Sequence, residues 1–127
     1  MRWRKEDGQS TVEFALVLPI LLLLIFGMMD FGWLFYNKVM VNNASREGAR
    51  YAVINCGTIG YGDAHETTIA YVESLLPGAV VTVEPTPISG DQITVTVNKE
   101  IRVLTGITSV FLGNTIDLQA TCTMRIE

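Results

Sequence analysis

The sequence predicts an α+β fold in which a long N-terminal helix and a second, short helix pack on a small antiparallel sheet. Three observations predict it. An apolar run begins near residue 12, a helical pattern continues beyond that run, and alternation with a period of two starts after residue 79. A chain of 127 residues has room for one small domain after the apolar run.

The apolar run has the length of a membrane span. The residues from Phe14 to Met29 are uncharged, and the acids Glu13 and Asp30 bound them, 17 positions apart. At ~1.5 Å per residue these acids are about 26 Å apart on a helix, close to the thickness of the hydrocarbon layer. We expect a transmembrane helix over residues 9–36. Its far interface carries an aromatic belt of Phe31, Trp33, Phe35 and Tyr36.

The run admits two other interpretations. A cleaved signal peptide fits less well, because the run exceeds the usual 7–15 residues and no A-x-A-like site follows it. An uncleaved signal anchor stays open. Basic residues are balanced across the run, since three precede it and three follow it. The short leader favours a cytoplasmic N-terminus and an extracytoplasmic C-terminal domain.

The helical pattern continues past the membrane. Apolar or small residues recur at steps of three or four, namely Trp33, Tyr36, Met40, Ala44, Gly48, Tyr51 and Ala52. The other face carries Lys38, Asn42, Ser45, Arg46 and Arg50. Asn55-Cys56-Gly57 indicates a stop, so one helix of about 60 Å is predicted from Val12 to Ile54. The row of small residues spaced by four favours close packing on the chain's own sheet over pairing with a second helix.

The remaining elements follow in order. A glycine-rich connector is predicted at residues 57–62, followed by a helix that begins at an Asp63–Glu66 capping box and ends at Pro77-Gly78. Strands are predicted for residues 79–84, 93–103 and 116–126, with a turn at 85–91 and a short helix or loop at 104–113. Lys99 interrupts the apolar set of the second strand, which suggests a bulge or an edge. The two helices are the available cover for the apolar face of the sheet.

The sequence contains few residues that could form a catalytic or metal-binding site. The lone His65 is expected to be solvated, and we predict no enzyme activity, metal or cofactor. A net charge of −4 without a basic stripe argues against nucleic-acid binding. Cys56 and Cys122 would be free to form a disulfide outside the cytoplasm, worth roughly 4 kcal/mol on chain entropy. Two buried free thiols are the alternative.

Several pieces of the N-terminal third resemble the TadE-like pilins of tight-adherence (Tad/Flp) pili. They are Gly8, the pair Glu13-Phe14, Pro19 within the leucine-rich run, and the segment Asn42 to Tyr51. The resemblance implies a pilin-like fold with a leader at residues 1–8, a transmembrane helix at 9–36 and a soluble α+β domain at 37–127. It also implies a minor pilin or pseudopilin that acts in pilus assembly or adherence.

The resemblance further implies a processing site and partners. A prepilin peptidase would cut between Gly8 and Gln9, and Glu13, followed by Phe14, would then neutralise the new amino group of Gln9 on a neighbouring subunit. Pro19 would kink the span. The partners would be a Flp-type major pilin, other TadE/TadF-like minor pilins, the inner-membrane assembly platform and membrane lipid. The alternative is a single-span membrane-anchored extracellular binding module that is never cleaved.

Overall fold

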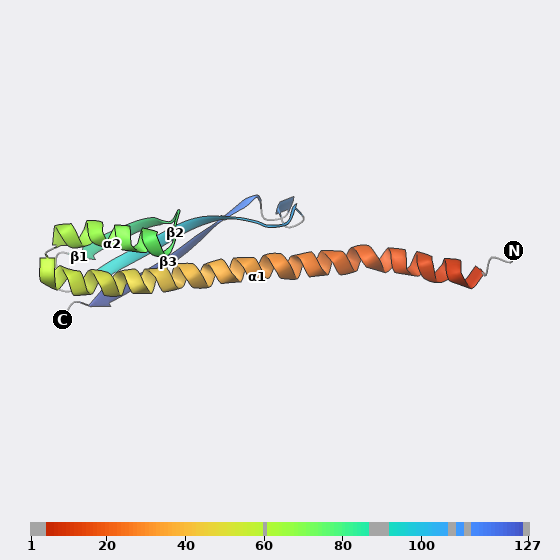
Figure 1. The fold of residues 1–127 in the computed structure, drawn as a ribbon, viewed down its shortest axis with the longest axis horizontal. Helices are drawn as coiled ribbons and strands as arrows, with labels where there is room; N and C mark the ends of the chain where they lie inside the picture. The colour runs from red at the N-terminus through yellow and green to blue at the C-terminus, as the bar shows by residue number, and fades with distance from the viewer. Residues whose placement is uncertain (1–4, 60, 87–91, 107–108, 111–112, 126–127) are drawn as a thin grey trace.

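The computed structural model of the chain describes residues 5–59, 61–86, 92–106, 109–110 and 113–125. It has two helices, α1 (Lys5–Ile59) and α2 (Tyr61–Leu75). Three strands follow, β1 (Val80–Thr86), β2 (Gln92–Arg102) and β3 (Thr115–Arg125). Figure 1 shows α1 as a long rod whose C-terminal half carries all the other elements, while its N-terminal half projects alone. The predicted α+β fold is confirmed.

The sheet is antiparallel throughout, in the order β1-β2-β3. Val83 pairs with Val95 of the central strand, and Val95 pairs with Cys122 of β3. The alternate side chains that point to one face are covered by α1, which packs on β2 and β3, and by α2, which packs on β1. The opposite face is polar, with hydroxyl pairs Thr94–Thr123 at 2.9 Å and Thr96–Thr121 at 3.2 Å. The sheet thus has one covered face, as its period-two pattern predicts.

The core lies between the C-terminal half of α1, α2 and the sheet. Small residues of α1 are almost fully buried in it, including Ala44, Ala49 and Ala52. A Cβ added to Gly48 would lie 2.6 Å from Val72 Cγ2 and 3.2 Å from Val95 Cγ1. The absence of a side chain at Gly48 therefore allows α1 to approach α2 and β2 together. This confirms that the small-residue row packs against the chain's own domain.

The helix boundaries differ from the prediction. The α1 helix begins at Lys5 and runs past the expected stop at Asn55-Cys56-Gly57 to Ile59, and α2 begins at Tyr61, two residues before Asp63. The predicted glycine-rich connector is therefore helical except for Gly60, which lies outside the described residues. A glycine inside a helix costs only about 1 kcal/mol, and packing of Val53 and Cys56 against the core exceeds that cost.

Three further details of the domain also differ. β1 continues through Pro85 to Thr86, which had been assigned to the turn; the rest of that turn lies outside the described residues. β2 pairs with β3 without a break across Lys99, so no bulge is present; Lys99 lies one residue beyond the β1–β2 pairing, which begins at Val80–Asn98. Ser45, predicted on the outer face, is buried because its hydroxyl donates to the Asn42 carbonyl at 2.9 Å.

The remaining predicted segments agree or lie outside the described residues. The apolar alternation of β3 from Ile116 to Met124 is confirmed, and Ile126 is not among the described residues. In the segment after β2, Gly106, Ser109 and Val110 are helical, and Gly113 has a φ of 83° that ends this turn before β3. The helix α2 ends before Pro77, with Gly78 at a φ of 79°, as predicted.

Candidate functional site

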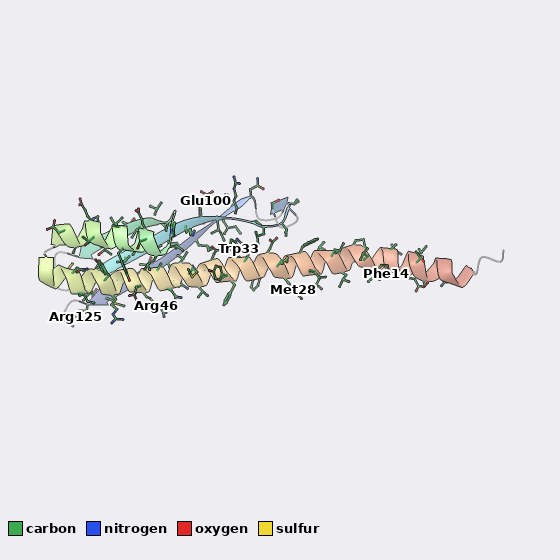
Figure 2. The ribbon with its side chains drawn as sticks, viewed as in Figure 1. Phe14, Met28, Trp33, Arg46, Glu100 and Arg125 are labelled. Carbon is green, nitrogen blue, oxygen red and sulfur yellow. The ribbon has the colours of Figure 1, made fainter. Side chains whose placement is uncertain are left out.

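The N-terminal half of α1 is an apolar rod that nothing in the chain covers. The consecutive residues Leu16, Val17 and Leu18 expose between 37% and 70% of their surface, and they point in different directions because successive residues of an α-helix lie about 100° apart around its axis. In Figure 2 the side chains around Phe14 radiate from α1, with no strand or second helix over them. A helix that is apolar on every side and exposed on every side is suited to a lipid environment rather than to water.

Among the described residues, α1 is the one helix long and apolar enough to cross a membrane. None of its most apolar 18-residue window is buried in the chain. A core helix of a soluble domain would be covered on at least one side, so that explanation does not apply. The N-terminal half of α1 is thus a candidate membrane span.

The predicted processing site lies at the free end of this rod. Gly8 and Gln9 are helical and exposed, and a side chain added at Gly8 would meet open space. The Gln9 side-chain amide donates to Glu13 Oε1 at 3.4 Å, one helical turn away. Gln9 and Glu13 therefore lie on the same face of α1, and Phe14 beside them is exposed. In the uncut chain Glu13 thus contacts an amide of its own helix.

The helix is continuous through Pro19. The span is therefore not locally melted at this residue, although the ring removes one backbone donor. In a membrane such a lost hydrogen bond is tolerated because neighbouring groups can satisfy the freed carbonyl. The predicted kink at Pro19 stays a prediction.

The junction between the exposed N-terminal half of α1 and the domain is formed by Asp30, the acid at the end of the apolar run. Asp30 is buried, with 6% of its surface exposed. Its carboxyl group accepts a hydrogen bond from the Thr105 backbone N–H at 3.0 Å and another from the Thr105 hydroxyl. Thr105 lies just after β2, 75 positions away in the sequence. Nothing in the local pattern around Asp30 could have indicated this contact.

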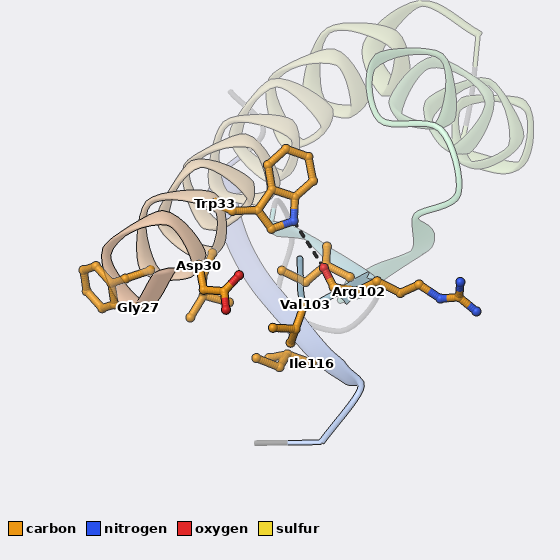
Figure 3. A pocket seen from close by; sticks show the side chains of 9 residues that line it. Gly27, Asp30, Trp33, Arg102, Val103 and Ile116 are labelled. Carbon is orange, nitrogen blue, oxygen red and sulfur yellow. Dashed lines mark hydrogen bonds between the residues drawn. The ribbon is translucent and has the colours of Figure 1, made fainter. Parts of the chain in front are cut away.

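Beside Asp30 a small apolar cavity separates α1 from the end of the sheet. It has a volume of about 120 Å³ and reaches from Gly27 and Leu34 on the helix to Val103 and Ile116. Figure 3 shows the Trp33 indole above it, donating to the Arg102 carbonyl at 3.3 Å. In the same view the Arg102 side chain extends away from the cavity. Trp33 of the predicted aromatic belt thus also fastens α1 to β2.

Further along α1, polar contacts continue to hold the helix to the domain. The Lys38 ammonium donates to the Gln119 carbonyl of β3 at 2.5 Å, whereas the Asn37 amide donates to the Trp33 carbonyl of its own helix at 2.9 Å. Tyr51 stacks on Tyr71 of α2, with ring centroids 4.3 Å apart. The packed half of α1 therefore begins at Asp30, inside the segment that the sequence assigns to the span.

The two cysteines are free thiols in the structure, and both are partly buried. Burial raises the pKa of the Cys56 thiol, because the thiolate would lose hydration. Cys122 lies opposite Val95 on the covered face of the sheet. The disulfide stays a prediction. In the part of the chain that the structure describes, no three His, Cys, Asp or Glu side chains gather as a metal site would require.

Comparison with known families gives one match, and it falls on this region. Residues 8–50 match the family model described as TadE-like protein. No curated protein and no solved structure matches the chain. The matched segment starts at the predicted processing site, contains the whole exposed rod and ends within the packed half of α1. The predicted resemblance is confirmed, and it associates the chain with Tad pilus systems.

Proposed function

Because residues 8–50 are TadE-like, we propose that this chain is a minor pilin or pseudopilin of a Tad/Flp-type pilus, cut after Gly8 by a prepilin peptidase. The observation that supports this most strongly is the coincidence of the family match with an apolar helix exposed on all sides. The cut would fall at the start of that helix. In this proposal the leader stays cytoplasmic and the domain lies on the other side of the membrane.

The geometry near the cut suits a role in assembly. Removal of residues 1–8 would leave a new amino group on Gln9, one turn from Glu13 on the same helix face. A carboxylate near hydrocarbon is costly unless it is paired. We propose that Glu13 binds the amino group of Gln9 on a neighbouring processed subunit, so that only cut chains assemble. The neighbours would be Flp-type major pilin or other minor pilins, gathered at the inner-membrane assembly platform.

The processing step can be tested by producing the full chain with an active prepilin peptidase and measuring the mass of the membrane-bound product. We expect an N-terminus at Gln9. Gly8→Leu should block the cut because the peptidase site would have to hold a large side chain there. Gly32→Leu is the matched control, since both glycines are helical and neither has an atom within 4 Å of an added Cβ. A wild-type product that keeps residues 1–8 would instead favour the uncleaved anchor.

The assembly role is tested separately with Glu13→Ala. We expect normal cleavage but reduced recovery of the subunit in sheared pilus fractions, because the new amino group would lose its acid. Glu66→Ala, which removes an exposed acid of α2, is the control and should be incorporated normally. Normal incorporation of Glu13→Ala would reject the ion pair without affecting the processing result.

A further inference from the structure

Between β2 and β3 the structure describes residues 103–106, 109–110 and 113–114, here called the β2–β3 connection. These residues reach further along α1 toward its N-terminus than any other described part of the domain (Figure 1). Thr105 of the connection is fixed to Asp30, and the cavity beneath its first residue, Val103, extends to Gly27 on the helix. The connection is therefore held against α1 where the exposed apolar rod meets the packed half. This position is set by hydrogen bonds within the chain.

The connection is also apolar in a place where a soluble domain would be polar. No charged residue occurs between Arg102 and Asp117. Within it Leu104 exposes 60% of its surface and Val110 exposes 79%. On the neighbouring strands the uncovered face carries threonine pairs instead. Large exposed aliphatic side chains that gather on one part of a surface indicate a contact with another apolar phase or molecule.

The depth of this region in a bilayer follows from α1. If Glu13 lies near one face of the hydrocarbon, Asp30 lies about 26 Å further along the helix, close to the other face. Lipid surrounds a single spanning helix on all sides at that level, so a segment packed on α1 there must also enter the boundary. The neighbouring side chains suit this boundary, because Trp33 has an amphipathic ring and the Arg102 side chain extends outward.

We propose that the β2–β3 connection is a second membrane contact, which inserts Leu104 and Val110 among phospholipid acyl chains while Arg102 reaches the phosphate groups. The Asp30–Thr105 hydrogen bonds hold the connection at this depth. The contact resembles that of a segment lying in the interface, with its apolar side chains a short way below the headgroups. This inference rests on the proposed membrane span.

The test places a spin label at one position at a time in the full chain, with Cys56 and Cys122 replaced by serine. The labelled variants are Val110→Cys in the connection, Leu23→Cys in the rod and Ile54→Cys at the far end of α1. All three positions are well exposed, so the label should not disturb packing. Each variant is placed in vesicles of phosphatidylcholine and phosphatidylglycerol, and its collisions with oxygen and with a water-soluble nickel chelate are compared.

We expect the oxygen-to-nickel ratio to be several-fold higher at Val110 and Leu23 than at Ile54, and to stay so when the protein is diluted in lipid. A water-like ratio at Val110 with a lipid-like ratio at Leu23 would overturn the membrane contact but leave the span. A ratio at Val110 that becomes water-like on dilution would identify a second copy of the chain as the occupant and also overturn it. A water-like ratio at Leu23 would overturn the span, and the inference with it.

Discussion

The two halves of α1 are one continuous helix with opposite distributions of side-chain size. In the half from Gly8 to Met29, large aliphatic side chains are exposed on every side. In the half from Asp30 onward, the buried positions are mostly small, as at Ala44, Gly48 and Ala52, while Arg46 and Arg50 face outward. The halves therefore differ in the size of their apolar residues and in the position of their charges, as well as in how apolar they are.

This difference matches the surroundings to which each half is suited. A helix packed against a sheet gains most from close backbone approach, which small residues permit and which fills the interior to high density. A helix in lipid gains from large apolar side chains on all faces, since no neighbouring chain has to fit against them. The same helical backbone therefore carries two different arrangements of side chains, small ones for close packing and large apolar ones for lipid. The boundary is marked by Asp30, the first buried residue among those whose burial the structure describes, which begin at Gly8.

The largest expected effect comes from a charge in the exposed apolar half. Leu23→Asp should weaken membrane insertion by about 3 kcal/mol, because an acid at the centre of a spanning helix is costly. Ile54→Asp is the matched control, with a similar exposed fraction in the other half, 60% against 57% for Leu23. Alkaline extraction of membranes should release Leu23→Asp and retain Ile54→Asp. Equal retention of the two variants would contradict the prediction that only the N-terminal half of α1 lies in the membrane.

The next effect concerns the junction itself. Asp30→Ala should destabilise the domain by about 2 kcal/mol, because the Thr105 N–H would lose the carboxylate that accepts its hydrogen bond at a partly buried position. Asp30→Asn keeps one acceptor oxygen and should lose less. Asp63→Ala, on the exposed surface of α2, is the control and should change stability little. Urea unfolding in detergent micelles measures all three, and an unchanged midpoint for Asp30→Ala would show that the junction does not hold the domain.

A smaller effect is expected at the close approach in the packed half. Gly48→Ala should destabilise the domain by about 1 kcal/mol. The added Cβ would lie 2.6 Å from Val72 Cγ2, and the cost of overpacking exceeds the gain in helix propensity. Gly62→Ala in α2, where nothing lies within 4 Å, should instead be neutral or stabilising. Thermal unfolding that shifts in the same direction for both variants would contradict this packing.

The smallest effect is at Cys56, near the end of the packed half. Its raised pKa means that the folded state favours the protonated thiol. This contribution to stability is therefore complete below the ordinary cysteine value of about 9 and declines as the pH rises through the higher folded value. In a Cys122→Ser variant, the midpoint of the alkylation rate against pH should lie higher in the folded than in the unfolded chain. Equal midpoints in the folded and unfolded chains would contradict the raised pKa of Cys56.

Much of this fold could be predicted because its elements have strong periods. The alternation from Ile93 to Ile101 and from Ile116 to Met124 identifies the two long strands and their covered face. The small residues of α1 likewise indicate close packing. The helix ends were less accurate, because Gly57 and Asp63 are only local signals, and packing of the last turns of α1 extends the helix beyond them.

The candidate site was predictable in its membrane part and not at its junction. The apolar run, Gly8, Glu13 and Pro19 are contiguous in the sequence, so one pattern contains them all. The contact between Asp30 and Thr105 joins residues 75 positions apart and depends on how far β2 extends along α1. The prediction that Ser45 faces outward was wrong for a different, local reason, since a hydroxyl that donates to its own helix can be buried at little cost.

The unbroken path of α1 has a mechanical consequence. From Asp30 to Ile59 the helix extends about 44 Å beyond the candidate membrane span at ~1.5 Å per residue. A change of about 10° in the inclination of the span would therefore carry the distal tip of the domain through about 8 Å, given that same helical rise. A small change in the tilt of the span would thus produce a large displacement of the end of the domain that lies farthest from it.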